Sequence, residues 1–141
     1  MGSSFGDLLA EEDEILQRIL AAGSRRVAIH AEDEARLCER RPLAEKAGDV
    51  GEHPNWRDVE SAFRATRRIV EIARTTGRPL HILHISTEEE IAFLVNHKGL
   101  VTVEVLPQHL TFAAPGCYEK LGARAQMNPP IRSLRHRQEL W

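Results

Sequence analysis

Several features that mark particular protein classes are scarce in this chain. It has only two cysteines, Cys38 and Cys117, which lie far apart and outside any CxxC pattern, so we expect two reduced thiols rather than a disulfide. No uninterrupted apolar run approaches the roughly 18 residues of a membrane helix. The N-terminal sequence does not have the basic segment followed by an apolar one that indicates a signal peptide. These absences favour a cytoplasmic protein that does not bind membranes.

An excess of charge of one sign is also missing. The 141 residues include 19 Lys and Arg against 21 Asp and Glu, which gives a formal net charge of −2. That balance provides no general field for holding nucleic acid or anionic lipid. No glycine-rich phosphate loop follows a predicted strand, which argues against an open α/β domain that binds nucleotides. With 42% hydrophobic and 28% charged residues, the composition is typical of one globular domain.

The sequence does contain alternating helix and strand patterns. Apolar residues at helical spacing, capping residues and β-branched runs predict the elements. We expect helices over 8–22, 32–41, 53–76, 87–98 and from 134 onward, and strands over 25–31, 80–85 and 100–106. A connecting stretch rich in Gly and Pro is expected over 42–54. This alternation predicts an α/β fold with a parallel sheet, either open and doubly wound or part of a barrel.

Two histidines occupy matching positions near the ends of the first two predicted strands. Because side chains alternate across a strand, Ala28 and His30 share one face of the first strand, and Ile82 and His84 share one face of the second. The carboxyl ends of parallel strands are where functional groups gather, so the two imidazoles are expected to lie close together. Neutral imidazole is a common zinc ligand. The alternative is a pair of hydrogen-bonded histidines at the rim of the sheet.

The other histidines are interpreted from their positions. His81 is expected on the face opposite His84, beneath the flanking helices, with a structural role. His109 follows the third strand and is a weaker candidate for the site. We expect three more on the surface, in loops or at helix ends: His53, His97 and His136.

Glu104 is an unusual residue for the middle of an apolar strand. It lies in "VTVEVLP", between Val103 and Val105. An unpaired carboxylate is costly to bury. Glu104 is therefore expected either to pair with an Arg or Lys inside the fold, or to orient a ligand of a functional site.

Four stretches of the chain resemble a known family. "AIHAEDEARL", "HILHISTEEE", "VTVEVLPQHLTF" and "AQMNPPIRSLRHRQELW" resemble, in that order, successive segments of dihydroorotase, a cyclic-amide hydrolase of the amidohydrolase superfamily. The resemblance runs over almost the whole chain. The Asn before two prolines in "MNPPIR" favours dihydroorotase over allantoinase and hydantoinase, whose matching segment usually has Ser there.

The resemblance implies a fold and a site. The chain, residues 1–141, would be a partial catalytic domain, roughly the fifth to seventh βα units of a (β/α)₈ TIM-type barrel that binds one or two Zn²⁺. His30 and His84 would hold metal at the ends of the fifth and sixth strands, and Asn128 would bind substrate after the seventh.

The resemblance also implies an activity: the zinc-dependent, reversible hydrolysis of dihydroorotate to carbamoyl-aspartate in pyrimidine biosynthesis. The partner would be this small-molecule substrate, not nucleic acid or a membrane, and a homodimer is left open. An allantoinase-like or hydantoinase-like cyclic amidohydrolase is the alternative.

Part of the family pattern is absent from these residues. The family also has an HxH pair on the first strand, a bridging carboxylate and an Asp on the eighth strand, and no HxH occurs here. A complete barrel needs about 250 residues. We therefore expect the chain to be inactive alone. A non-catalytic dihydroorotase-like remnant or an assembly partner is the alternative from another class.

Overall fold

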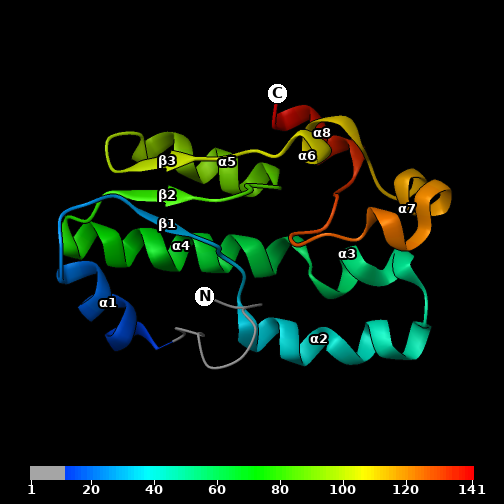
Figure 1. The fold of residues 1–141 in the computed structure, drawn as a ribbon, viewed down its shortest axis with the longest axis horizontal. Coiled ribbons are helices and arrows are strands. Elements are labelled where there is room, and N and C mark those ends of the chain that lie inside the picture. Colours follow the sequence, from blue (N-terminus) through cyan, green and yellow to red (C-terminus); the bar gives the residue numbers. More distant parts are fainter. Residues whose placement is uncertain (1–11) are drawn as a thin grey trace.

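The sheet at the centre of the molecule has three parallel strands. The structure, a computed structural model, describes residues 12–141. Its strands lie in the order β1-β2-β3, with bounds Val27–Ile29, Leu80–Ile82 and Val101–Val103 (Figure 1). In the sheet register Val27 pairs with Leu80, and Leu80 pairs with Val101. The predicted α/β fold with a parallel sheet is confirmed, with strands shorter than expected.

The helices surround this sheet unevenly. In Figure 1, α3, α6, α7 and α8 lie beyond the carboxyl ends of the strands, whereas α1 lies near their amino ends. The α-helices are α1 (Asp13–Ala21), α2 (Glu34–Ala47), α3 (His53–Trp56), α4 (Val59–Thr76), α5 (Glu88–Leu94), α6 (Pro107–Thr111), α7 (Gly116–Leu121) and α8 (Leu134–Glu139). Single turns of 3₁₀-helix are η2 (Val50–Glu52), η3 (Val95–His97) and η4 (Gly122–Ala125).

The main hydrophobic core lies between one face of the sheet and α1, α4 and α5. Leu80 and Ile82 from β2 are fully buried in it, together with Ile69 and Val70 from α4. The other face of the sheet is formed by the row Ala28, His81 and Thr102, of which Ala28 and Thr102 are exposed. The described sheet therefore packs its helices on one face and leaves the other uncovered.

A second, smaller cluster lies away from the sheet. It joins α7 to the loop that follows η4, and its buried members are Cys117, Tyr118, Ala125 and Ile131. Cys38 is exposed and Cys117 is buried, and no disulfide joins these two thiols, as predicted. No helix among residues 12–141 has the length and apolar character needed to cross a bilayer.

The first helix agrees with the prediction where it is described. Its bounds are Asp13–Ala21, and Leu16 and Leu20 are buried in the main core, as their spacing indicates. Two apolar residues that the prediction also placed in this helix, Leu8 and Leu9, lie outside the described residues.

The prediction that residues 42–54 connect two elements is wrong in its first half. Helix α2 continues through Pro42 and ends at Ala47. A proline inside a helix removes one hydrogen bond and crowds the preceding turn. The helix is nevertheless capped at both ends, because the Asp33 side chain accepts from the Arg36 amide and Gly48 takes the left-handed conformation (φ 61°).

The long helix predicted over 53–76 is two helices, α3 and α4. Asp58 interrupts it, since its side chain caps α4 by accepting a hydrogen bond from the Ser61 amide at 3.0 Å. Trp56 therefore does not lie on the apolar face of α4. Its indole Nε1 donates to the carbonyl of Leu37 on α2.

Candidate metal and substrate site

His30 and His84 meet at the carboxyl ends of β1 and β2. Nδ1 of His30 lies 2.7 Å from Nε2 of His84, and the rings cross edge-to-face with an interplanar angle of 72°. Both side chains are half-buried. At this distance one nitrogen carries a proton that the other accepts. The predicted closeness of the two imidazoles is confirmed.

The route by which His84 reaches this position differs from the prediction. Ile29 pairs with Ile82, so strict alternation would direct His84 toward the helix-covered face. Strand β2 instead ends at Ile82, and His84 takes a left-handed backbone conformation with φ 42°. It is the one non-glycine residue with positive φ among residues 12–141. The backbone turn brings its imidazole to His30.

The same register corrects the prediction for His81. Because His81 pairs with Ala28 and Thr102, it lies on the uncovered face of the sheet rather than beneath the helices. Its Nδ1 lies 2.8 Å from the Thr102 hydroxyl oxygen. The error arose because the prediction extended the alternation of β2 as far as His84, beyond the end of the strand.

Glu104 holds the backbone of His84. The Glu104 Oε2 atom accepts a hydrogen bond from the His84 amide at 3.0 Å. Within the described part of the chain, no Arg or Lys lies at ion-pair distance from this carboxylate. Of the two interpretations of Glu104, the geometry favours the one in which it orients a candidate site residue. It acts on the main chain, where a left-handed residue needs support.

Glu32 and Arg57 form a buried pair beside His30 that sequence reasoning did not single out. Glu32 is fully buried, and Arg57 donates to both of its carboxylate oxygens. Nε2 of His30 lies 3.3 Å from Glu32 Oε2 and has no hydrogen-bond partner among residues 12–141. Burial would raise the pKa of Glu32, but the nearby His30 imidazole and Arg57 guanidinium outweigh burial and lower that pKa to about 2. The one available signal was the position of Glu32, two residues after His30.

Electrostatics favour a neutral imidazole at His84. Burial, followed by the neighbouring His30, lowers the pKa of His84 to about 4. Near neutral pH the ring is therefore uncharged and has a lone pair to offer, which is the form that binds metals.

These residues fit a metal ion. Two imidazole nitrogens approach each other, and His30 keeps its second nitrogen beside a carboxylate, as histidine ligands commonly do. Two nitrogens bound tetrahedrally at 2.0–2.1 Å from zinc would be about 3.3 Å apart. The 2.7 Å pair would thus have to open by only about 0.6 Å to hold a cation where it now shares a proton.

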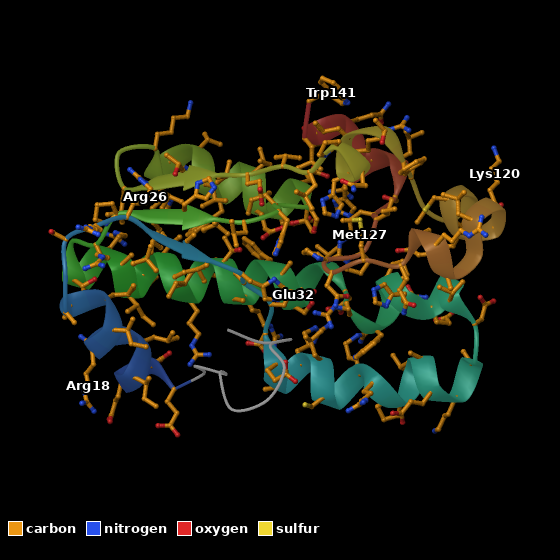
Figure 2. All side chains as sticks on the ribbon, viewed as in Figure 1. Arg18, Arg26, Glu32, Lys120, Met127 and Trp141 are labelled. Atoms are coloured by element: carbon orange, nitrogen blue, oxygen red, sulfur yellow. The ribbon has the colours of Figure 1, made fainter. Side chains whose placement is uncertain are left out.

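Asn128 lines a small cavity near this pair. The cavity has a volume of about 300 Å³, and its lining residues are His53, Trp56, Arg57, Gln126, Met127 and Asn128. Asn128 is exposed. Arg57 connects the cavity to the histidine pair, because it lines the cavity and also binds Glu32. Figure 2 shows Glu32 and Met127 toward the carboxyl ends of the strands.

The prediction of a surface position was wrong for His53 and His136. His53 is 4% exposed; its Nε2 lies 3.0 Å from the Met127 carbonyl and its Nδ1 3.3 Å from Gln126 Nε2. His136 is 9% exposed, and its Nδ1 accepts from the Glu88 amide. Both lie near helix ends in the sequence, but other segments cover them. His97 is half-buried.

His109, the weaker candidate, is buried near the site. It is 2% exposed, and its Nε2 lies 3.1 Å from the carbonyl of Pro129, the residue after Asn128. Burial lowers its pKa. His109 thus supports the Asn128 loop, and no described residue forms a hydrogen bond with its Nδ1.

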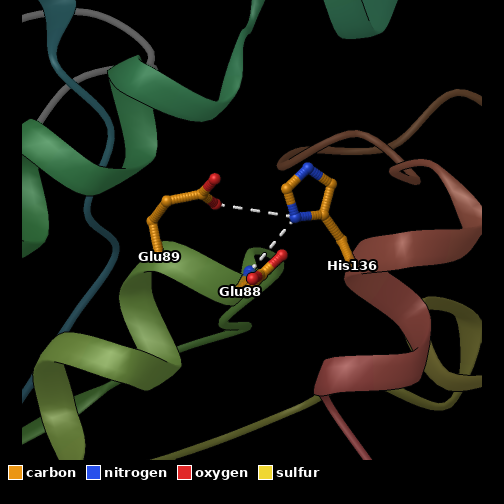
Figure 3. Close-up of side chains that lie close together, drawn as sticks. All are labelled: Glu88, Glu89 and His136. Atoms are coloured by element: carbon orange, nitrogen blue, oxygen red, sulfur yellow. Dashed lines mark hydrogen bonds and ion pairs between the residues drawn. The ribbon is translucent and has the colours of Figure 1, made fainter.

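A second group of potential metal-binding side chains lies where α5 meets α8. Glu88, Glu89 and His136 bring one ligand atom each within 4.8 Å of the others (Figure 3). The Arg135 guanidinium binds the Glu88 carboxylate and lies 3.8 Å from that of Glu89. Since His136 Nδ1 already accepts the Glu88 amide and Arg135 supplies positive charge, we assign no ligand to this group.

The fold and the histidine pair define a segment of a parallel βα enzyme fold with its candidate site at the carboxyl ends of the strands. No protein-family model matches the chain. It is 36% identical over 126 residues to an allantoinase of Bacillus velezensis, covering 86% of this chain and 28% of that protein. It is 33% identical over 148 aligned positions to a dihydroorotase of Pyrococcus furiosus, covering 100% of this chain and 30% of that protein.

A solved structure gives the same result. A D-hydantoinase crystal structure superposes with a TM-score of 0.86 at 26% identity, covering 98% of this chain and 32% of the other. The chain belongs to the cyclic amidohydrolases of the amidohydrolase superfamily. It spans less than a third of the length of each of these relatives.

Proposed function

We propose that the chain is part of the catalytic barrel of a zinc-dependent dihydroorotase, roughly its fifth to seventh βα units. His30 and His84 would hold one or two zinc ions, and Asn128 would contact the substrate ring. The protein that contains the chain would hydrolyse dihydroorotate reversibly to carbamoyl-aspartate, in pyrimidine biosynthesis and in the cytoplasm. The observation that carries the proposal is the 2.7 Å approach of two imidazole nitrogens at the carboxyl edge of a parallel sheet.

Bound zinc would supply a Lewis acid that polarises the ring carbonyl and activates water near neutral pH. The work of this chain is to hold that ion in place. His84 offers a neutral imidazole, and Glu104 keeps its backbone turned toward His30. Glu32, itself held by Arg57, lies beside the second nitrogen of His30 and favours the tautomer whose Nδ1 is free to bind.

Asn128 would orient the ring. A primary amide offers both donors and an acceptor, so it can pair with the alternating N–H and C=O groups of a cyclic amide. The exposed Asn128 borders a cavity of about 300 Å³, which is of the size expected for a small ring compound. A serine at this position would offer a shorter side chain with one hydroxyl.

A second candidate is a cyclic amidohydrolase that acts on allantoin or hydantoin. Relatives named allantoinase and solved structures named hydantoinase support it. The Asn in "MNPPIR" favours dihydroorotate instead. The two candidates share their metal site and differ in the ring that Asn128 contacts.

The test begins with the source DNA on both sides of this reading frame. In-frame codons for an HxH pair upstream and an Asp-bearing strand downstream would permit expression of the full gene product. That product is then assayed with zinc on dihydroorotate, allantoin and hydantoin under the same conditions. We expect ring opening of dihydroorotate to be fastest, and Asn128→Ser to reduce it more than it reduces the other two activities.

Two results would contradict the proposal. Stop codons on both sides would leave no source for the remaining ligands, and a binding role would replace catalysis. Faster turnover of allantoin or hydantoin would transfer the proposal to the second candidate. His81→Ala serves as the control variant, because His81 lies within β2, shortly before His84, and its Nδ1 faces Thr102 rather than the histidine pair.

A further inference from the structure

Arg132 is a buried cation that links three segments of the molecule. It is 5% exposed, and its guanidinium donates to the carbonyl oxygens of Arg57 and, at 3.3 Å, Asp58. Its Nε donates to the Ser86 hydroxyl, also at 3.3 Å. Its own carbonyl accepts from the Ala114 amide at 2.8 Å. One side chain thus joins the start of α4, the loop after β2 and the loop before α8.

Each of these segments carries a residue of the candidate site. Asn128 lies four residues before Arg132 on the same loop. Ser86 lies two residues after His84. Arg57, whose carbonyl Arg132 binds, holds Glu32 beside His30 through its side chain. The Arg132 guanidinium therefore connects the segments that carry the histidine pair to the loop that carries Asn128.

Burying the Arg132 guanidinium in this way lowers the stability of the fold, which suggests that the position of this side chain has a role. Within residues 12–141 no carboxylate lies at ion-pair distance from Arg132, so its charge is balanced only by carbonyls, a hydroxyl and more distant carboxylates. Removing a charge from water without a direct partner disfavours folding. A planar guanidinium can bind three acceptors in fixed directions, whereas the compact ammonium of Lys cannot reproduce that fork. This geometry suits a residue that fixes the positions of the segments it contacts.

The neighbouring buried carboxylate strengthens the link at Ser86. Glu90 is 2% exposed, and its Oε2 accepts from the Ser86 amide at 3.3 Å and from the Thr87 hydroxyl at 2.9 Å. Ser86 is thus held from its backbone by Glu90 and from its hydroxyl by Arg132. Two buried side chains, Glu90 and Arg132, thus hold the loop that follows His84.

We propose that Arg132 is a positioning residue that holds Asn128 in register with the His30–His84 pair. The inference rests on the proposed function for the importance of that register, but the contact network itself can be tested without metal or substrate. Replacing the guanidinium releases the Asn128 loop from the loop that follows His84, and the surroundings of both side chains change.

The test uses NMR of the zinc-free 141-residue chain. The side-chain ¹⁵N resonances of His84 and Asn128 are compared in the parent, in Arg132→Lys and in Ser86→Ala. We expect both resonances to shift or broaden in Arg132→Lys, and to shift less in Ser86→Ala, which removes one of three acceptors. Arg78→Lys is the matched control, because this half-buried arginine lies before β2, at the amino end of the strands, where its guanidinium donates to the Leu20 carbonyl at 3.5 Å.

The proposal is overturned if Arg132→Lys and Ser86→Ala leave both resonances as in the parent and only lower the midpoint of unfolding. It is also overturned if Arg78→Lys shifts them equally, since general destabilisation would then explain the effect. If Arg132→Lys does not fold, Ser86→Ala decides the matter by the same two resonances. A zinc titration of the parent tests the proposed function separately, so that one can fail while the other holds.

Discussion

At the scale of single residues, the candidate site depends on two imidazoles that compete for one proton. His84 is neutral near pH 7, and its Nε2 faces Nδ1 of His30 at 2.7 Å. A zinc ion that replaces this proton would gain two of the three ligands that catalytic sites usually have. Affinity should therefore be modest, and each histidine should be necessary.

We expect His84→Ala to weaken zinc binding to the chain by at least about tenfold. His81→Ala should leave binding unchanged, because His81 lies within β2 and its Nδ1 faces the Thr102 hydroxyl rather than the histidine pair. Competition against a chromophoric zinc chelator measures both variants. Equal affinities in His84→Ala and the parent would remove His84 from the metal site.

Glu104 provides a second prediction at this scale. Glu104→Ala leaves the amide of His84 without its acceptor, and an unpaired, partly buried amide costs about 1 to 2 kcal/mol of unfolding free energy. Glu104→Gln keeps an acceptor oxygen and should cost less. Urea unfolding of the two variants separates the lost hydrogen bond from the lost charge. If the two variants are equally stable, Glu104 does not support this backbone through that bond.

The residues of the site could be predicted only in part from the sequence. Strand position and the alternation rule were enough to bring His30 and His84 together, and a carboxylate among valines drew attention to Glu104. The Glu32–Arg57 pair joins residues 25 positions apart, and no local pattern connects them. The left-handed turn at His84 has no decisive sequence signal either, because histidine, although enriched among non-glycine residues with positive φ, mostly has negative φ.

At the scale of elements, helix α7 and the loop after η4 are joined through one phenol. Tyr118 is 4% exposed, and its hydroxyl oxygen accepts from the Ile131 amide at 3.2 Å. Burial raises the pKa of Tyr118 to about 12. Because the chain has a single tyrosine, phenolate absorbance reports this contact alone.

We expect a spectrophotometric titration to give a midpoint near 12 rather than near 10. The folded state favours the protonated phenol, so its contribution to stability is present below pH 10 and is lost as the pH rises toward 12. That loss amounts to about 3 kcal/mol. Tyr118→Phe should lack this component of the alkaline decline. A midpoint near 10 in the folded chain would contradict the burial of the phenol.

The elements themselves were predictable where capping and periodicity agree. Thr87 and Glu90 indicated the start of α5, and the Thr87 side chain does accept the Glu90 amide, at 3.2 Å. The errors arose where two signals conflict. Pro42 predicted a break that the capped helix α2 does not make, and Asp58 made a break that the apolar pattern of 53–76 concealed. Tertiary contacts decide such conflicts, and the sequence does not display them.

At the scale of the whole molecule, the described structure exposes apolar side chains on both flanks of its sheet. On α1, Ile15 and Ile19 are 40% and 50% exposed. At the β3 edge, Val95 of η3 and Val103 of β3 are 48% and 38% exposed, and they border an apolar groove of about 580 Å³. In a barrel these positions would be covered by neighbouring βα units.

We therefore expect the isolated 141-residue chain to have no measurable dihydroorotase activity. It brings two histidines together, whereas catalytic zinc sites usually have three protein ligands. A ring-opening assay with added zinc checks this expectation. Zinc-dependent turnover by the purified chain, lost in His84→Ala, would sink it. The parent's zinc titration, run in parallel, shows whether the metal is bound when turnover is absent.

The left-handed residue at the end of β2 has a consequence for how such a site changes over time. The direction of the His84 imidazole depends on one backbone torsion angle, φ 42°, and not on the number of residues along the strand. Insertions or deletions in neighbouring loops should leave that angle unchanged, because Glu104 on the adjacent segment maintains it. A β-branched residue at position 84 would oppose the angle itself. The site should therefore tolerate sequence changes in its surroundings but be lost on a single substitution at position 84.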